Sequence, residues 1–193
     1  MKTQTILLVG VGGQGTILAG DLLAGCAAEE GYDVKISEIH GMSQRGGSVT
    51  TVVRFGDCVH SMICDEGCAD YLVSFEAVEA LRAKHYLRES GKAFVNTHII
   101  TPVSVHIGNY TMPSDKTIQV HLNDMNACSI DASKFALDAG TPKSTNVVLM
   151  GAISNYLPFK IETWQKVISN RVPKKTINKN LTAFMCGREE ANI

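Results

Sequence analysis

The sequence GVGGQG at residues 10–15 decides the fold that this chain is expected to adopt. It follows an apolar run at residues 6–9 and precedes residues 16–30, whose apolar side chains recur at helical spacing. A strand, a glycine-rich turn and a helix in this order leave N–H groups without partners at the helix N-terminus, and such groups suit a phosphate or a carboxylate. The stretch therefore predicts a strand–turn–helix unit with an anion-binding end.

A second strand is expected at residues 34–39, which completes a β–α–β unit. Because crossovers of this kind are nearly always right-handed, the first two strands are expected to be parallel and adjacent. Residues 49–55 form a β-branched run, and a turn at residues 56–57 leads to a possible returning strand at residues 58–63. This pattern predicts an antiparallel hairpin.

The rest of the chain alternates strands and helices and then becomes helical. Asp131 is expected to cap a helix that ends near residue 137, and residues 103–107 and 117–122 are candidate short strands. Further strands are expected at residues 71–75, 92–96 and 127–130, and further helices at residues 76–87, 145–156, 161–170 and 176–185. The expected fold class is α/β: a single Rossmann-like domain over residues 1–193, with a mostly parallel sheet, a β-hairpin insertion and a helical C-terminal tail.

The composition is that of an ordinary soluble globular protein. Hydrophobic residues make up 45% and charged residues 19% of the chain, and the formal net charge is -1, so neither nucleic acid nor a membrane surface is expected as a partner. Residues 6–28 are mostly apolar but contain Gln14, Asp21 and glycines at positions 10, 12, 13, 15 and 20, which fits a strand, turn and helix better than an export signal. A cytoplasmic location is therefore expected.

Two local patterns have more than one interpretation. Residues 160–188 contain seven basic residues and only one acidic residue, Glu162, which fits a solvated helical face or a surface that docks an anionic partner. Cys58, Cys64 and Cys68 form the only cysteine cluster, and their spacing matches neither a zinc ribbon nor a ferredoxin motif. Reduced structural thiols are expected, with a metal or redox role as the alternative.

The glycine-rich turn also satisfies G-x-G-x-x-G through Gly10, Gly12 and Gly15, in the strand–turn–helix context of a dinucleotide site. Glu38 is a loose candidate for the acidic residue that such a site needs. The alternatives are bound NAD or FAD and a turn built for close packing.

A second loop follows the second strand. It contains Arg45, whose guanidinium suits a carboxylate or phosphate, beside paired glycines that allow close approach. A solvated loop is the alternative. His40 is a candidate general base or a hydrogen-bonded structural residue, and Asn146 and Asn180 are expected to cap helices or bind neighbouring loops.

Five segments together resemble the gamma-type subunits of the 2-oxoacid:ferredoxin oxidoreductases, and within them the small (beta) subunits of indolepyruvate oxidoreductases. They are VGVGGQGT at residues 9–16, SEIHGMSQRGGSV at residues 37–49, VNT at residues 95–97, NVVLMGA at residues 146–152 and NLTAF at residues 180–184. HGMSQRGGSV is the specific signal, because pyruvate-type subunits typically carry a different stretch there. This chain departs from the family at His60, Ser61 and Met62, where an aromatic residue and a Ser-Pro pair are common.

The resemblance implies a heteromeric enzyme that oxidatively decarboxylates an aryl 2-oxoacid, such as indolepyruvate, to an acyl-CoA and passes electrons to ferredoxin. Thiamine diphosphate and iron–sulfur clusters would belong to a larger partner subunit. This sequence contains neither a G-D-G thiamine fingerprint nor cluster-type cysteine spacing. It is therefore expected to be the non-thiamine-binding subunit, inactive alone, with coenzyme A as a co-substrate of the complex.

No catalytic residue or metal ligand is expected on this chain. Its two loops are expected to face the partner, the 2-oxoacid or CoA through Gly12, Gly13, Gln14, Gly15, Ser43, Gln44, Arg45, Gly46 and Gly47. The alternative is a free-standing Rossmann-like nucleotide-binding protein or an NAD-dependent oxidoreductase.

Overall fold

The computed structural model describes residues 1–41, 46–108 and 110–191 of the chain. Six strands are present: β1 (Gln4–Val11), β2 (Asp33–His40), β3 (Ser48–Gly56), β4 (Ala69–Ser74), β5 (Leu87–Asn96) and β6 (Cys128–Ile130). The helices are α1 (Thr16–Glu29), α2 (Ala77–Ala83), α3 (Val103–His106), α4 (Asp115–Asp124), α5 (Ala132–Asp138), α6 (Thr145–Ser154), α7 (Ile161–Arg171) and α8 (Ile177–Glu190), with short 3₁₀ turns η1 (Lys84–Tyr86), η2 (Pro142–Ser144) and η3 (Lys174–Thr176).

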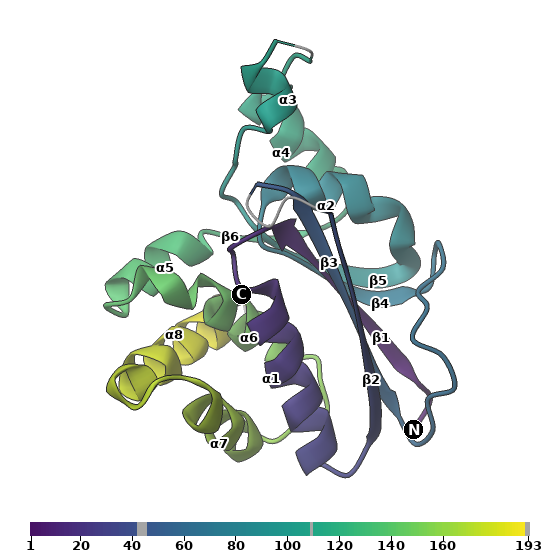
Figure 1. Ribbon diagram of the computed structural model, residues 1–193, viewed down its shortest axis with the longest axis vertical. Coiled ribbons are helices and arrows are strands. Elements are labelled where there is room, and N and C mark those ends of the chain that lie inside the picture. The colour runs from purple at the N-terminus through teal and green to yellow at the C-terminus, as the bar shows by residue number, and fades with distance from the viewer. Residues whose placement is uncertain (42–45, 109, 192–193) are drawn as a thin grey trace.

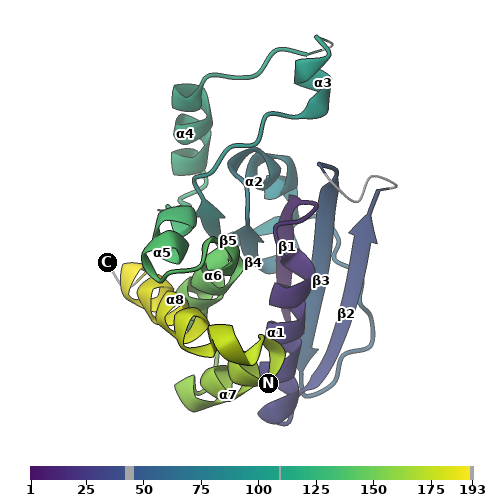
Figure 2. The same cartoon turned by 60° about the vertical axis from the view of Figure 1, so that its left-hand side comes forward.

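The strands form one sheet in the order β2-β3-β1-β4-β5-β6 (Figure 1). The pairs β1–β4, β4–β5 and β5–β6 are parallel, whereas β3 is antiparallel to both β1 and β2. Helices α1, α6, α7 and α8 lie on one side of the sheet, and α2 and α4 lie on the other (Figure 2). The α/β class, the mostly parallel sheet and the helical C-terminal tail are thus confirmed.

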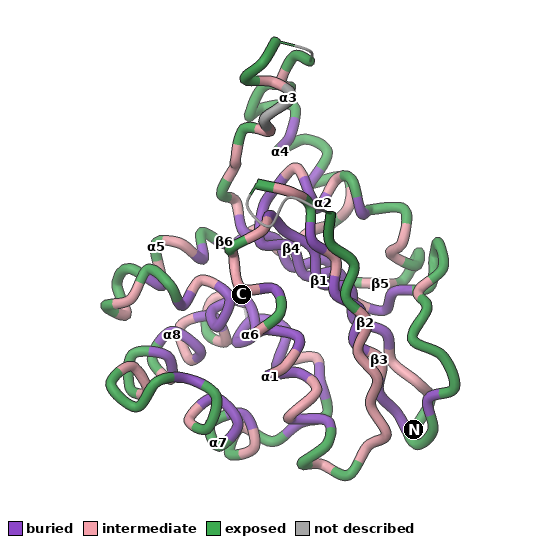
Figure 3. The backbone as a smooth tube through the Cα atoms, viewed as in Figure 1, coloured by how far each residue is buried: buried purple, intermediate pink, exposed green. Residues whose placement is uncertain are grey.

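The predicted adjacency of the first two strands is wrong, because β3 lies between them. Thr51, Val52 and Val53 of β3 are buried one after another, so both faces of this strand are covered and it needs an interior position. β2 instead has no buried residue and carries charged side chains, which only an edge strand tolerates (Figure 3).

The predicted hairpin is also misplaced: the hairpin strands are β2 and β3, and residues 58–63 form no strand. Nη1 of Arg54 donates to the carbonyl oxygens of Ser61 and Ile63, each at 2.9 Å. The backbone N–H of Val59 donates to Oδ2 of Asp33 at 2.7 Å. Side chains therefore satisfy backbone groups of this segment that a strand ladder would otherwise use.

The two candidate short strands at residues 103–107 and 117–122 are wrong as well, since helices α3 and α4 occupy these positions. Oγ of Ser114 accepts the backbone N–H of Thr117 and so caps α4, while Ile118 and Leu122 bury one face of that helix. The predicted cap of α5 is confirmed, because Asp131 accepts the N–H of Lys134 at 3.0 Å.

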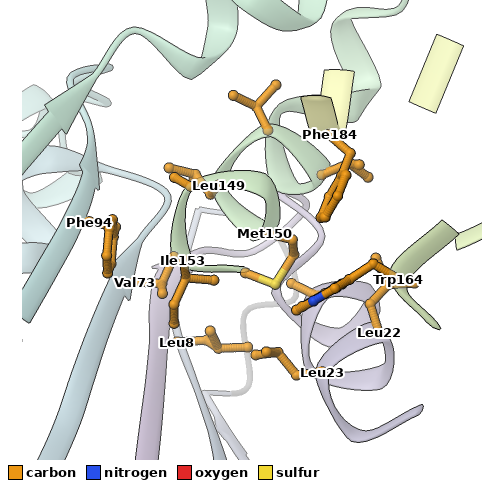
Figure 4. Close-up of a cluster of buried hydrophobic side chains, with 14 of the residues drawn as sticks. Leu8, Leu22, Leu23, Val73, Phe94, Leu149, Met150, Ile153, Trp164 and Phe184 are labelled. Carbon is orange, nitrogen blue, oxygen red and sulfur yellow. The ribbon is translucent and has the colours of Figure 1, made fainter. Parts of the chain in front are cut away.

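Alternate residues of β1 build two cores. Ile6 and Leu8 pack with the α1 and α6 side, whereas Leu7 and Val9 pack with the α2 and α4 side. The larger core contains side chains from β1, β4 and β5 and from helices α1, α5, α7 and α8, which surround α6 (Figure 4). The residues of α6 from Asn146 to Ser154 are all buried. None of the helices in the described parts of the chain is long and apolar enough to span a membrane.

Helices α6 and α8 cross with their backbones in close approach. A Cβ atom built on Gly151 would overlap the carbonyl oxygen of Phe184, and one built on Gly187 would overlap the carbonyl oxygen of Val148. Backbone atoms cannot turn aside as a flexible side chain can. Glycine at these two positions therefore sets how closely the C-terminal tail approaches the core.

Gly187→Ala is expected to lower the free energy of unfolding by about 3 kcal/mol, because overpacking at a backbone contact outweighs the better helix propensity of alanine. Urea denaturation of the purified chain measures the change. Gly41→Ala is the control, since a Cβ there meets no described atom within 4 Å, and it is expected to change stability by less than about 0.5 kcal/mol. Equal effects of the two substitutions would contradict the close crossing.

Cys64 yields a pH-dependent prediction. Burial, the largest influence, and the neighbouring Cys68 together raise the pKa of its thiol to about 11. At pH 8 roughly a thousandth of the thiol would then be ionised, so alkylation by iodoacetamide is expected to be about two orders of magnitude slower than for an ordinary exposed thiol. Site-resolved mass spectrometry over pH 7 to 11 should show the Cys64 rate still rising near pH 10. A plateau below pH 9 would rule out the raised pKa.

Candidate functional site

The structure brings the glycine-rich turn and the base of the second loop together. The backbone N–H of Gly12 donates to the carbonyl oxygen of Gly47 at 2.8 Å, and the adjacent residues Val11 and Ser48 pair in the β1–β3 ladder. Both loops therefore lie at the carboxyl end of β1. This edge is where open α/β sheets place ligands. The predicted residues Ser43, Gln44 and Arg45 lie outside the described residues.

Two separate physical requirements, backbone conformation and packing, explain the glycines of the turn. Gly13 and Gly15 have φ of +101° and +82°, in the left-handed region that L side chains rarely adopt. A Cβ at Gly15 would also lie 2.6 Å from Nδ2 of Asn146, and one at Gly10 would lie 2.8 Å from Oε1 of Gln14. Backbone conformation and packing thus account for Gly10, Gly13 and Gly15 without a bound dinucleotide.

Amide side chains hold the turn against neighbouring elements. Gln14 accepts the N–H of Val11 at 2.7 Å and donates to the carbonyl oxygen of Phe75 at 3.0 Å. Asn96 donates to the same carbonyl at 3.1 Å. Asn146 donates to the carbonyl oxygen of Gly15 at 3.2 Å, so the expectation that it binds a neighbouring loop is confirmed. The amide of Gln14 thus binds backbone groups within the protein, and that Gln14 also faces a ligand or partner stays a prediction.

Two clefts share this turn as a common wall. The smaller cleft, of about 440 Å³, is lined by Gly12, Gly13, Gly15, Thr16, Ile17, His40 and Val49. The larger cleft, of about 570 Å³, is lined by Gly13, Gln14, Gly15, Leu18, Asn96, His98, Ile100, Ser133, Pro142, Lys143, Thr145 and Asn146. Gly13 and Gly15 are common to both, so the turn is a ridge between two hollows.

The larger cleft has the chemistry of an anion site. Among the described residues, Lys143 is the only lining residue with a fixed charge, and His98, Ser133 and Thr145 add polar groups. Helix α1 begins at Thr16 beside the cleft; its N-cap is Gly15, no described side chain caps it, and its first turn has no acidic residue. Its N-terminal N–H groups and the positive end of its dipole therefore remain available to a negative group.

The strand order weighs against a dinucleotide. In a dinucleotide-binding unit the acidic residue ends the strand next to the glycine-rich strand. Here β3 intervenes, which moves Glu38 on β2 two strand spacings, about 10 Å, away from β1. The N–H of Gly12 is moreover already used by Gly47.

His40 lines the smaller cleft, and its Nδ1 lies 3.3 Å from the carbonyl oxygen of Gly41. This contact fits the structural interpretation of that residue. The sequence interpretation missed His98, Ser133 and Lys143. Asn96 was noted only as part of the VNT segment, since an isolated asparagine after a strand carries no signal of its own.

The basic C-terminal segment is partly used for packing. Lys166 pairs with Glu29 at 2.6 Å, and Arg171 pairs with Asp21 at 2.9 Å, so both contact α1. Within the described parts of the chain, no group of three or more His, Cys, Asp or Glu side chains is arranged to hold a metal ion. All six cysteines are free.

Gly15→Ala is expected to destabilise the chain by about 2–4 kcal/mol, the sum of left-handed backbone strain and the overlap with Asn146. In an Asn146→Ala background the overlap is absent, so the same substitution is expected to lower stability by only about 1–2 kcal/mol. Denaturant titration of the four proteins in this cycle measures the coupling. Gly13→Ala is the control, because a Cβ there meets no atom within 4 Å, and its effect should be equal in both backgrounds. No coupling between residues 15 and 146 would refute the proposed contact.

Comparison with known proteins gives the chain its family. The family described as pyruvate ferredoxin/flavodoxin oxidoreductase matches residues 5–190. The indolepyruvate oxidoreductase subunits IorB of Thermococcus kodakarensis and Pyrococcus horikoshii are each 43% identical to this chain over 196 residues, covering 99% of it and 97% of the relative. The crystal structure of a keto/oxoacid ferredoxin oxidoreductase gamma subunit from Geobacter sulfurreducens matches with a TM-score of 0.73 and 25% identity, covering 98% of both chains. The resemblance in the sequence is thereby confirmed: the chain belongs to the pyruvate ferredoxin/flavodoxin oxidoreductase family.

Proposed function

We propose that this chain is the non-thiamine-binding subunit of a heteromeric 2-oxoacid:ferredoxin oxidoreductase that acts on aryl 2-oxoacids such as indolepyruvate. The observation that carries the proposal is the 43% identity, over nearly the whole of both chains, to subunits named for indolepyruvate oxidoreductase. The complex would convert the 2-oxoacid and CoA to an acyl-CoA and pass two electrons to ferredoxin.

The cofactors of this reaction would lie in the partner subunit. Thiamine diphosphate supplies the carbanion chemistry, and iron–sulfur clusters carry the electrons. Among the described residues, no three His, Cys, Asp or Glu side chains converge as ligands of an iron–sulfur cluster would, which supports placing the clusters in the partner. The chain would therefore be inactive alone.

The contribution of this chain would be to bind and orient an anionic reactant. In the larger cleft, the Lys143 ammonium and the N-terminal N–H groups of α1 favour a phosphate of CoA or a carboxylate. The predicted loop residues Ser43, Gln44 and Arg45, with Gly46 and Gly47, would face the partner subunit or an anionic reactant. Gly13, which borders both clefts, would let the ligand approach the backbone closely.

The function is tested by expressing the chain together with its thiamine- and iron–sulfur-containing partner. The purified complex is expected to reduce ferredoxin only when indolepyruvate and CoA are both present. The isolated chain is expected to show no such activity and no bound nucleotide. A free chain that oxidises or reduces substrates with NAD would overturn the proposal.

Lys143→Ala in that complex is expected to raise KM for CoA about fivefold with little change in kcat, because an exposed charge at a binding site contributes about 1 kcal/mol. Lys116→Ala, an exposed lysine on α4 outside both clefts, is the matched control. Arg45→Ala is measured in parallel for complex formation and Michaelis constants. If both variants at the clefts kept wild-type constants and assembly, the assigned binding role would be abandoned.

A further inference from the structure

Two glutamates at the start of α2 are buried behind the clefts. Glu76 is 1% exposed and Glu79 is 5% exposed. Carboxylates are rarely buried this far, since leaving water is unfavourable unless each oxygen gains a partner. One partner of Glu76, Ile100, lines the larger cleft, and one partner of Glu79, Ser48, is next to Val49, which lines the smaller cleft.

Glu76 fixes one wall of the larger cleft. Its Oε2 accepts the N–H of Glu79 at 2.8 Å, which caps α2, and its Oε1 accepts the N–H of Ile100 at 2.9 Å. Next to it, the N–H of Ala77 donates to the carbonyl oxygen of His98 at 3.0 Å. His98 and Ile100 both line the larger cleft, so this wall is attached to the first turn of α2.

Glu79 fixes one wall of the smaller cleft. Its Oε2 accepts the hydroxyl of Ser48 at 2.6 Å, and its Oε1 accepts Nη1 of Arg82 at 2.7 Å. Ser48 lies between Gly47, which accepts the N–H of Gly12, and Val49, which lines the smaller cleft. The start of β3 is thereby attached to α2 as well as to β1.

Hydrogen bonds add to close packing in these attachments, because Ala77 and Ala80 of α2 also pack in the smaller core with Val9 and Val95. On the side of the glutamates, a hollow of about 220 Å³ is lined in part by Glu76, Glu79 and Ile100. Side chains that border a hollow cannot replace a lost hydrogen bond by packing more tightly. The spacing of the two cleft walls from α2 is therefore sensitive to the glutamate contacts.

We propose that Glu76 and Glu79 are positioning residues that hold the walls of the two clefts at the spacing required by the anionic reactant. This inference rests on the proposed function. The two side chains stand one helical turn apart on α2, so a single rigid element sets both walls. Neither glutamate lines the larger or the smaller cleft, and each acts through the backbone or hydroxyl that it holds.

The decisive variant is Ser48→Ala in the complex of this chain with its partner subunit. Ser48 is exposed, so the substitution removes the contact to Glu79 without opening the core. It is expected to raise KM for CoA or the 2-oxoacid about threefold to tenfold and to leave kcat within about twofold, since a hydrogen bond to a charged group is lost. Ser48→Thr retains the hydroxyl and is expected to restore the constants.

Ser90→Ala is the matched control, because Ser90 is an exposed serine on β5 outside both clefts. Glu79→Gln is the second variant: it keeps the size of the side chain but weakens both contacts, and it is expected to raise the same KM. The melting temperature of every variant is measured beside its kinetics. A purely structural role would lower the melting temperature and leave KM unchanged.

The outcomes separate this inference from the proposed function. A raised KM in Ser48→Ala that Ser48→Thr reverses supports positioning by Glu79. Wild-type KM values in Ser48→Ala and Glu79→Gln, with a raised KM in Lys143→Ala, would overturn the positioning role and leave the proposed function standing. Wild-type KM values in all three would overturn the positioning role and count against the binding role of the larger cleft, while ferredoxin reduction by the complex tests the proposed function separately.

Discussion

The carbonyl oxygen of Phe75 connects the strand ends at the edge of the sheet where the two clefts lie. Gln14 reaches it from the glycine-rich turn after β1, and Asn96 reaches it from the end of β5. A carbonyl oxygen has two lone pairs, and these two donors use both. Three neighbouring strand ends thus become one rigid edge. Asn96 extends the edge further by accepting the N–H of Ala132 at the start of α5.

The position of β3 decides what this edge can bind. In a plain doubly wound sheet the second strand would stand next to β1 and offer Glu38 to a ribose. The buried run in β3 takes that place instead and brings Gly47 to Gly12. One side of the glycine-rich turn is therefore covered by the protein backbone at Gly47. The remaining open sides are the two clefts, where the N-terminal end of α1 favours a negative group.

Local sequence patterns predicted most helices and strands, because caps and periodicity are local signals: Asp131 before α5 is an example. They could not predict strand order, since the pairing of β3 with β1 joins segments distant in sequence. Nor could they predict that contacts of Arg54 and Asp33 keep residues 58–63 out of the sheet. The site was predicted in part. The glycines predict the turn. Lys143 and His98 line the larger cleft, and Glu79 binds Ser48, but these residues come from separate elements and no sequence spacing identifies them.

The glycines themselves separate folding from ligand binding. A side chain at Gly10 would meet Gln14, and one at Gly15 would meet Asn146, so packing within the protein requires glycine at both positions. At Gly13 a side chain would meet no described atom within 4 Å, and this residue borders both clefts. Its positive φ still favours glycine, and its backbone lies at the ridge between the two clefts. Close approach of a reactant or partner to the backbone is therefore concentrated at Gly13, and the rest of GVGGQG serves to hold it there.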